Sequence, residues 1–280
     1  MDSSVSNSKE QSMEFSVVMA TYSGDEPEWL YLAGKSVFAQ TRTPDELIIV
    51  FDGFVDSKHH EAVNRLTSMG RVTTIQLATN VGPGLARHKG ILRARNEIIA
   101  IMDADDICKP CRFESQLSIL ESGLVDVVGS WISEFDLLPG DIGELRKVPE
   151  VHDDILVFAR KRTPMNNVSV VFFKGLYLDV GGYSCQRANE DYDLYVRMLL
   201  KGYRFYNIQK VLVDVRSGPS MISRRGGISQ VPDDAKMFFR MYQSGFISFF
   251  DVIFNTGTRA LARVLPNNLR QTLYRAFLRD

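Results

Sequence analysis

Runs of apolar and β-branched residues alternate with helical patterns over the first hundred residues, and this alternation restricts the fold more than any other feature. Such strands, apolar on both faces and separated by helices, predict a parallel sheet covered by helices on both sides. We therefore expect an α/β fold with a mainly parallel central sheet flanked by helices. The expected strands are 15–21, 47–53, 72–78 and 97–103, and the expected helices are 29–39, 56–69 and 85–96.

The pattern changes after residue 110 but contains no interdomain linker and no internal repeat. Glycines and polar residues separate the predicted elements, and from about residue 232 the chain is expected to be helical to its end. We expect helices at 112–123 and 190–200, strands at 125–135 and 168–174, and a pair of strands at 205–208 and 211–216.

Composition limits the classes of function. The chain has 280 residues, a formal net charge of −1 and 24% charged residues, which argues against a general nucleic-acid binder. No run of 18 apolar residues is present, and the polar N-terminal segment, residues 1–12, is expected to be a disordered lead-in to a cytoplasmic protein. Cys108 and Cys111 form one CxxC pair, but a structural zinc site needs about four ligands, so we expect no metal or redox role for them.

Acidic residues follow the strand predicted at 97–103, in the stretch IIAIMDADDICKP. In parallel sheets ligands bind outside the carboxyl ends of the strands, where Asp52, Asn80 and the acids Asp103, Asp105 and Asp106 are all expected to lie. The acids have two interpretations. They either cap the helix that follows, or they bind a hard cation such as Mg²⁺ or Mn²⁺, which takes one or two carboxylates together with substrate phosphates.

A second acidic group occurs in NEDYDLYVRM, residues 189–198. Asn189 is expected at the N-cap of a helix, with Glu190 and Asp191 in its first turn. One interpretation is a favourable interaction of these charges with the helix dipole. The other is a general base at the rim of a cleft, because an ionised carboxylate there can accept a proton from a sugar hydroxyl.

Several stretches in their order along the chain resemble family 2 glycosyltransferases of the GT-A (Rossmann-like) fold, and specifically the bacterial exopolysaccharide, capsule and O-antigen branch that includes amylovoran-type enzymes. The resemblance runs from about residue 15 to 227. It rests on FSVVMATYSG, SVFAQTRTPDELIIVFDG, NVGPGLARHKGI, MDADD and GGYSCQRANEDYDLYVRMLLKG.

The resemblance implies roles for the matching positions. The catalytic residues would be Asp191 as the base and Glu190 as the residue that positions the acceptor. Asp105 would be the direct metal ligand, with Asp103 facing both the metal and the ribose. The other nucleotide-binding positions implied are Thr21, Tyr22, Asp52 for the uracil, Asn80 and Arg87.

The same resemblance implies a metal-dependent, inverting hexosyltransferase that uses Mn²⁺ or Mg²⁺. It would move one sugar, Glc or Gal, from a UDP-sugar to a polyprenyl-diphosphate-linked glycan in cell-surface polysaccharide synthesis. Residues 13–110 would form the nucleotide-sugar-binding half, residues 111–231 the acceptor-binding half of the same domain, and residues 232–280 a C-terminal helical extension. The QxxRW motif of processive synthases is absent.

Two basic segments have open interpretations. Arg224 and Arg225 lie in RSGPSMISRRGG and belong either to a solvated loop or to a mobile loop that clamps the diphosphate. The tail either packs as amphipathic helices or rests on anionic lipid at the cytoplasmic face of the inner membrane. Its arginines are Arg259, Arg263, Arg270, Arg275 and Arg279.

Three other functions fit the sequence less well. A dinucleotide-dependent oxidoreductase would need a third glycine where Arg87 stands, and its motif would not follow the third strand. A nucleotide-sugar-binding protein without transfer activity would lack the base or the metal acids, and both groups are present. A sugar-1-phosphate nucleotidyltransferase would carry a basic glycine-rich loop after the first strand, where this chain has the acidic TYSGDEPE.

Overall fold

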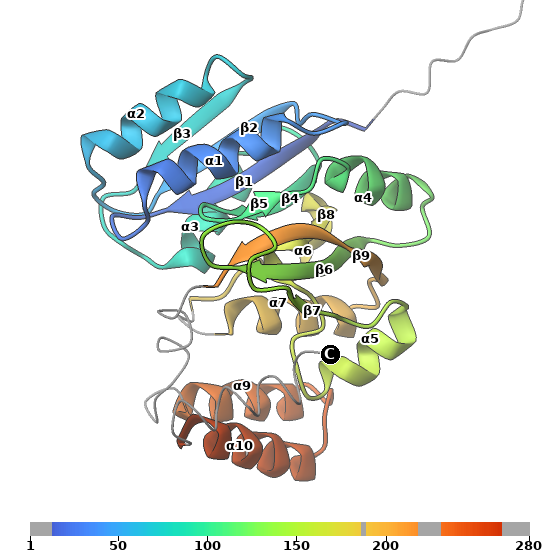
Figure 1. The fold of residues 1–280 in the computed structure, drawn as a ribbon. Helices are drawn as coiled ribbons and strands as arrows, with labels where there is room; N and C mark the ends of the chain where they lie inside the picture. Colours follow the sequence, from blue (N-terminus) through green and yellow to red (C-terminus); the bar gives the residue numbers. More distant parts are fainter. Residues whose placement is uncertain (1–12, 186–188, 218–230, 265–280) are drawn as a thin grey trace, which may run out of the picture.

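The computed structural model describes residues 13–185, 189–217 and 231–264 (Figure 1). A nine-stranded sheet forms the centre of this part of the chain, in the order β3-β2-β1-β4-β8-β6-β9-β5, with β7 paired to β6. The strands are β1 (Phe15–Thr21), β2 (Glu46–Phe51), β3 (Val72–Gln76), β4 (Ile98–Asp103), β5 (Ile107–Cys108), β6 (Val127–Phe135), β7 (Glu144–Arg146), β8 (Val171–Phe173) and β9 (Phe205–Arg216). The helices are α1 (Pro27–Phe38), α2 (Ser57–Leu66), α3 (Pro83–Arg93), α4 (Arg112–Glu121), α5 (His152–Ala159), the 3₁₀ turn η1 (Asn167–Ser169), α6 (Lys174–Asp179), α7 (Glu190–Leu200), α9 (Val231–Gln243) and α10 (Phe249–Val264).

The first four strands form the predicted parallel sheet, in the order β3-β2-β1-β4. Almost every residue of β1, β2 and β4 is buried, because helices cover both faces. The sequence prediction of these strands is confirmed to within a few residues.

The second half of the sheet is mixed. β8 runs antiparallel to both β4 and β6, whereas β6 and β9 are parallel. Our prediction of two strands at 205–208 and 211–216 is wrong, because the single strand β9 runs through both. Ser130 pairs with Ile208 and Trp131 with Val211, so the residues between these partners form a bulge. The intervening Gln209 and Lys210 lack the glycine, proline or asparagine typical of a turn.

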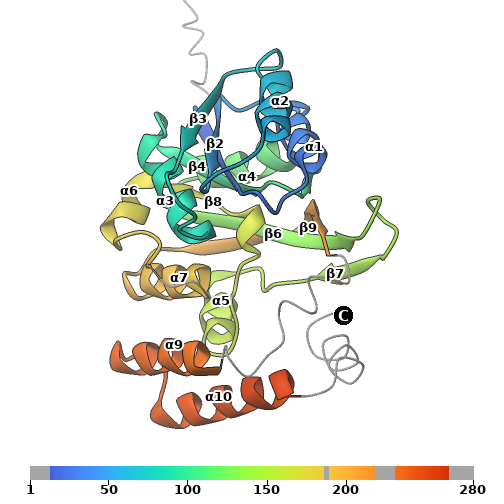
Figure 2. The same cartoon turned by 90° about the vertical axis from the view of Figure 1, so that its left-hand side faces the viewer.

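Alternate residues of each strand serve two separate cores. Val17 and Met19 of β1 pack with α1, α2 and α4, whereas Val18 packs with α3, α5, α6 and α7. In a third core, Tyr192 of α7 packs with Phe238 of α9 and Val252 of α10. Figures 1 and 2 show the consequence: α9 and α10 lie beyond α7, on the side away from the sheet.

The side chain of Arg112 joins α4 to β4. Its side chain is fully buried, and its Nη2 donates to the carbonyl of Ile101 at 2.7 Å while Nε donates to Gln116 at 3.0 Å. Cys108 lies against the same guanidinium, whereas Cys111 is exposed. The two cysteine sulfurs therefore have different surroundings, with one in the core and one on the surface.

Candidate active site

The carboxyl ends of the parallel strands meet at one edge of the sheet. Thr21, the last residue of β1, pairs with Phe51 at the end of β2, and Ala20 pairs with Asp103 at the end of β4. Asp52 follows β2 directly, and Asn80 follows β3 by four residues. The structure thus brings the residues predicted at the strand ends to the same edge.

Asp52 is buried and holds the turn that starts α3. Its two carboxylate oxygens accept hydrogen bonds from the backbone N–H groups of Val81 at 2.7 Å and Gly82 at 2.9 Å. Asn80 donates from its side chain to the Asp52 carbonyl at 3.2 Å. Gly82 has φ 91°, a conformation that glycine adopts without steric cost. Asp52 and Asn80 therefore shape the loop at this edge through direct contact with each other.

Asp25, which the sequence analysis missed, ties down the loop after β1. Its carboxylate accepts from the Thr21 hydroxyl at 3.0 Å and from the Tyr22 N–H at 3.2 Å. Burial raises the pKa of Asp25, against the lowering effect of these hydrogen bonds. Nearby Asp103 also raises this pKa. The Asp25 carboxylate is thus part of the acidic group at the end of β4, although it lies far away in the sequence.

The three acids after β4 have different surroundings. Asp106 is buried and accepts from the backbone N–H of Arg216 at 2.8 Å, so it joins β9 to this loop. Asp105 is partly buried, and burial together with Asp103 and Asp25 raises the pKa of Asp105 to about 7. Burial and the neighbouring Asp105 and Asp103 raise the pKa of Asp106 as well, so what distinguishes Asp106 is its hydrogen bond to β9.

Arg216 is the basic residue that supports the Asp105 loop. Its Nε donates to the Asp105 carbonyl at 3.2 Å, and its guanidinium lies 4.2 Å from the ring centre of Trp29 and 4.5 Å from that of Phe135. Stacking between two rings fixes a guanidinium that would otherwise be mobile. No sequence signal distinguished Arg216, because its partners come from distant segments.

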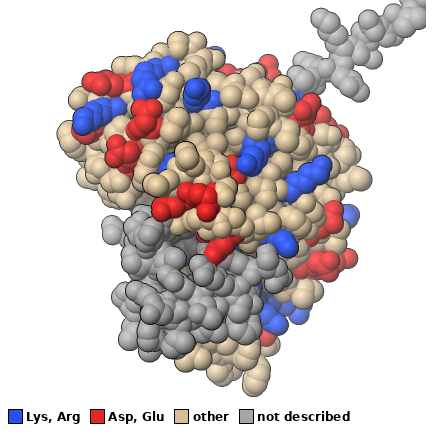
Figure 3. All heavy atoms as spheres, viewed as in Figure 1, with Lys and Arg blue, Asp and Glu red and all other residues tan. Residues whose placement is uncertain are grey.

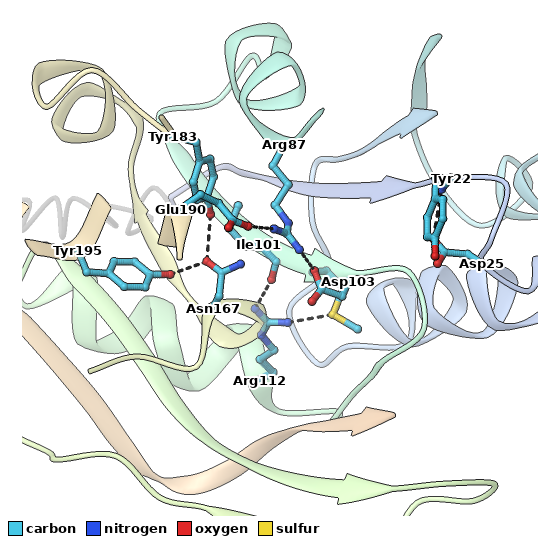
Figure 4. A network of polar contacts seen from close by, with 11 residues as sticks. Tyr22, Asp25, Arg87, Ile101, Asp103, Arg112, Asn167, Tyr183, Glu190 and Tyr195 are labelled. Atoms are coloured by element: carbon cyan, nitrogen blue, oxygen red, sulfur yellow. Dashed lines mark hydrogen bonds and ion pairs between the residues drawn. The ribbon is translucent and has the colours of Figure 1, made fainter. Parts of the chain in front are cut away.

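Arg87 connects the strand edge to α7, as Figure 4 shows. Its guanidinium lies 2.5 Å from Asp103 and 3.9 Å from Glu190, and the residue is only 8% exposed. Burial opposes the charge on Arg87, but the neighbouring carboxylates outweigh it and raise the pKa of Arg87 above its ordinary value. Two acidic groups that are separate in the sequence thus share one buried cation.

The first turn of α7 faces the Arg87 guanidinium. Burial and the neighbouring Asp191 raise the pKa of Glu190 to about 7, although Arg87 acts in the opposite direction. Asp191 is partly exposed, and one of its oxygens accepts from the N–H of Tyr192 at 2.8 Å. Asp193, in contrast, forms an ion pair at 2.9 Å with Arg197, one turn further along α7.

Asn189 is at the predicted N-cap position but does not cap α7 with its side chain. It has φ 59°, the only positive value at a non-glycine residue in the described ranges. Its side chain instead donates to Asp234 of α9 at 2.9 Å, and Asp234, which is fully buried, pairs with Arg259 of α10 at 2.9 Å. The C-terminal helices therefore hold the residue that precedes Glu190 and Asp191.

Asn167 joins two tyrosine side chains next to α7. Its side-chain oxygen accepts hydrogen bonds from the hydroxyls of Tyr183 at 3.0 Å and Tyr195 at 2.6 Å (Figure 4). Burial raises the pKa of both tyrosines, so both hydroxyls stay protonated. The sequence marked the turn at Tyr183 but gave no reason to join it to Asn167.

The acidic edge suits a divalent cation by its chemistry. Among the described residues no group of three or more histidine, cysteine or acidic side chains has the geometry of a complete metal site. A Mg²⁺ or Mn²⁺ ion typically takes only one or two protein carboxylates, and its other ligands are water and substrate phosphates. Burial, together with the charges of Asp103 and Asp25, raises the pKa of Asp105, and a cation beside this carboxylate would oppose both effects.

Two predicted positions, Arg224 and Arg225, lie outside the described residues, as do Arg270, Arg275 and Arg279 of the tail. No helix in the described segments is both long enough and apolar enough to cross a bilayer.

Comparison with known proteins identifies the family of this site. The model of "Glycosyl transferase family 2" matches residues 16–170, more than half of the chain. An Escherichia coli protein, UDP-Gal:α-D-GlcNAc-diphosphoundecaprenol β-1,3-galactosyltransferase, is 35% identical over 267 residues, which cover 95% of this chain and 97% of the relative. The chain belongs to glycosyltransferase family 2.

Further relatives of this family 2 glycosyltransferase agree with the predicted branch. The amylovoran biosynthesis glycosyltransferase AmsE of Erwinia amylovora is 32% identical over 93% of this chain and 97% of its own length. The mannosyltransferase PcManGT of Pyrobaculum calidifontis, solved with GDP-Man and Mn²⁺, superposes with a TM-score of 0.64 at 17% identity, over 94% of this chain and 73% of that one. S. aureus TarS 1-349 with UDP-GlcNAc gives 0.62 at 18% identity, over 95% and 72%. The GT-A fold predicted from the sequence is confirmed.

Proposed function

We propose that this glycosyltransferase moves one Gal or Glc residue from a UDP-sugar to a hydroxyl of a polyprenyl-diphosphate-linked glycan, with inversion at the anomeric carbon and with Mn²⁺ or Mg²⁺ as cofactor. The observation that carries the proposal is the Arg87 bridge, which joins the strand-end acids to the acidic first turn of α7. A donor at the strand edge and a base on α7 would then act in one site. The Escherichia coli relative, which uses UDP-Gal and a lipid-linked GlcNAc, supports Gal and this class of acceptor.

The proposed division of labour follows the two halves of the sheet. Residues 13–110 would bind the nucleotide sugar, with Thr21, Tyr22 and the Asp52–Asn80 loop around the nucleotide. Residues 111–231 would bind the acceptor and supply the base, and residues 232–280 would form the helical extension. Support comes from the contacts: Asp52 fixes the loop between β3 and α3, and Asp25 fixes the loop after β1.

Asp105, together with Asp103, would hold the cation. Held by these two carboxylates, a divalent cation would supply positive charge against the negative charge that develops on the diphosphate as UDP leaves. Asp103 keeps one oxygen on Arg87, which orients its carboxylate. Arg216 holds the backbone of Asp105 in position from the other side.

Asp191 would remove the proton from the acceptor hydroxyl as that oxygen attacks the anomeric carbon. Asp191 lies in the first turn of α7 and is partly exposed, which suits a base that meets an acceptor hydroxyl. Glu190, with a pKa of about 7, can accept or donate a hydrogen bond to a neighbouring sugar hydroxyl near neutral pH. The single displacement by this hydroxyl is what gives inversion.

Single-turnover transfer from UDP-Gal and UDP-Glc with Mn²⁺ tests the assignment. The Asp191→Asn variant should keep UDP affinity but lose at least about a hundredfold in transfer rate, because general-base catalysis contributes about 10² to 10⁴-fold. Asp154→Asn is the matched control, because Asp154 also lies in the first turn of a helix, α5, but is exposed. Asp154→Asn should transfer at the wild-type rate.

Two results would contradict the proposal. If Asp191→Asn transfers as fast as the wild type, another group is the base. If the wild type releases UDP only by hydrolysis and transfers to no lipid-linked diphosphate glycan, the acceptor class is wrong while the family assignment stands.

A further inference from the structure

The outward face of α10 exposes large apolar side chains. Their spacing of one and four residues places them on one side of the helix. α9 continues this surface with Phe239 and Tyr242, and the rings of Tyr242 and Phe249 lie 5.6 Å apart. We call this surface the α9–α10 outer face; its α10 members, with their exposed fractions, are Phe249 (55%), Phe250 (78%), Ile253 (59%), Phe254 (56%) and Leu261 (65%).

The orientation of this face is fixed by contacts on the opposite side of the same helix. Val252 packs in the core that joins α7, α9 and α10, and Asn255 donates to the carbonyl of Arg160 at 2.8 Å. Arg259 points inward to Asp234 and lies over the rings of Tyr192 and Phe238. The outer face therefore cannot turn inward without breaking these contacts.

Figure 3 agrees with this description. The lowest part of the molecule, which α10 occupies in the matching view of Figure 1, presents uncharged atoms. Five bulky apolar side chains on one helix face, each more than half exposed, are unusual for a surface in water.

Charge is also distributed unevenly along the chain. Residues 231–280, which include α9 and α10, contain seven lysines and arginines and four aspartates, although the whole chain has a net charge of −1. Lys236 and Arg240 are exposed on α9, one turn apart, with Phe239 between them on the same side. Lys236 lies 3.8 Å from the half-exposed Asp233, so Arg240 is the cation more readily available to an anionic surface. Phenylalanine and isoleucine next to basic residues are typical of helices that lie in the interface of an anionic bilayer.

We propose that the α9–α10 outer face docks on the surface of an anionic bilayer. The apolar side chains enter the boundary between headgroups and acyl chains, and Lys236 and Arg240 approach the anionic headgroups. This inference deepens the proposed function, because a lipid-linked acceptor is confined to a bilayer. The inner face of the same two helices holds Asn189, so the docked surface is joined through Asp234 and Arg259 to the start of α7.

Co-sedimentation of the full chain with phosphatidylglycerol–phosphatidylethanolamine vesicles tests the proposal. Replacing Phe250 and Phe254 together by serine should lower the partition coefficient at least about tenfold, because burial of even half of two such side chains is worth that factor. The matched control replaces two equally exposed apolar residues elsewhere, Phe54 (83%) and Leu124 (71%), by serine. It should bind vesicles like the wild type, and neutral phosphatidylcholine vesicles should bind the wild type less.

Several outcomes would overturn the docking surface. One is a wild-type chain that does not bind anionic vesicles, and another is equal loss of binding in the control variant. Vesicle binding that appears only after residues 265–280 are removed would show that this segment covers the face in the full chain. The wild-type chain could also form a dimer in solution and bind no vesicles. If the Phe250→Ser, Phe254→Ser double variant were then monomeric, the face would be a contact between two copies of the chain.

The same variants separate this inference from the proposed function. Transfer to a water-soluble acceptor with a short lipid should be unchanged in the Phe250 and Phe254 double variant, and transfer to acceptor in vesicles should fall. If no acceptor is used at all, the proposed function fails while the vesicle measurement still decides the docking surface.

Discussion

Glu190 is the residue for which the structure makes the most exact prediction about stability. Its side chain is only 12% exposed, and it packs against Gly84, where an added Cβ would lie 2.7 Å from the Glu190 Cγ. Burial and Asp191 raise the pKa of Glu190 to about 7 from the ordinary value of 4.5. The folded chain therefore favours the protonated, neutral form of this side chain.

The size of the effect follows from proton linkage. Because the pKa is raised on folding, the folded chain holds a proton that the unfolded chain has released between about pH 4.5 and 7, so stability falls as pH rises through this range. The full contribution is present below pH 4.5 and lost above pH 7. At about 1.4 kcal/mol for each tenfold change in proton affinity, the loss is about 3 kcal/mol. This figure already includes the attraction of Arg87 at 3.9 Å, because Arg87 is one of the groups that set the pKa of Glu190.

We therefore expect Glu190→Gln to stabilise the fold at pH 8.5 by about 3 kcal/mol and to leave it nearly unchanged at pH 4.5. The amide has a similar size and carries no charge to desolvate. The measurement is urea unfolding at both pH values in the presence of EDTA, which keeps divalent cations away from the neighbouring acids. Transfer activity should fall in the same variant, because Glu190 is proposed to position the acceptor. A carboxylate kept at a cost in stability is typical of functional sites.

Glu61→Gln is the control. Glu61 is exposed on α2, so its substitution should change stability by less than about 0.5 kcal/mol at either pH. A Glu190→Gln variant that is less stable than the wild type at pH 8.5 would refute the reasoning. It would mean that the ion pair with Arg87 outweighs the burial of the Glu190 charge.

Three further substitutions test the contacts of the site. Asp105→Asn should weaken UDP binding in Mn²⁺ by at least about tenfold and leave binding in EDTA unchanged, as measured by calorimetry, because a neutral amide is a poor ligand for a hard cation; equal affinity in Mn²⁺ would remove Asp105 from the metal site. Gly84→Ala should displace Glu190 and slow transfer severalfold with less than about 1 kcal/mol of change in stability, and an unchanged transfer rate would show that the position of Glu190 is unimportant. Arg259→Met should destabilise the chain by about 2 to 4 kcal/mol by leaving the buried Asp234 without this cation, and adding Asp234→Asn should recover part of the loss in thermal unfolding.

The strand edge could be predicted from the sequence because its determinants are local. The apolar runs at β1, β2 and β4 are bounded by polar and turn residues, and each strand formed within one or two residues of its predicted limits. Parallel pairing then brings the strand ends together without any further information. Asp52 and Asp103 could be located in this way before any contact was known.

Other features depend on contacts between distant segments, which a local pattern does not contain. The strand β9 is continuous because β6 pairs along its whole length and accommodates the bulge at Gln209 and Lys210. Arg216 stacks between rings from α1 and β6, and the carboxylate of Asp25 joins acids nearly 80 residues away. Each of these partners was visible in the sequence as a residue type but not as a neighbour.

The acidic first turn of α7 depends both on a local sequence pattern and on contacts with distant segments. The sequence left two interpretations open, favourable placement at a helix N-terminus and a catalytic base, and the structure makes them compatible. The side chain of Asn189 bonds to Asp234 and does not cap α7, while Glu190 faces Arg87 and thereby Asp103. A turn needed only for helix stability would not require a residue at φ 59° or a buried glutamate with a pKa of about 7. Such strain and burial at the same turn are typical of functional sites, which favours the catalytic interpretation.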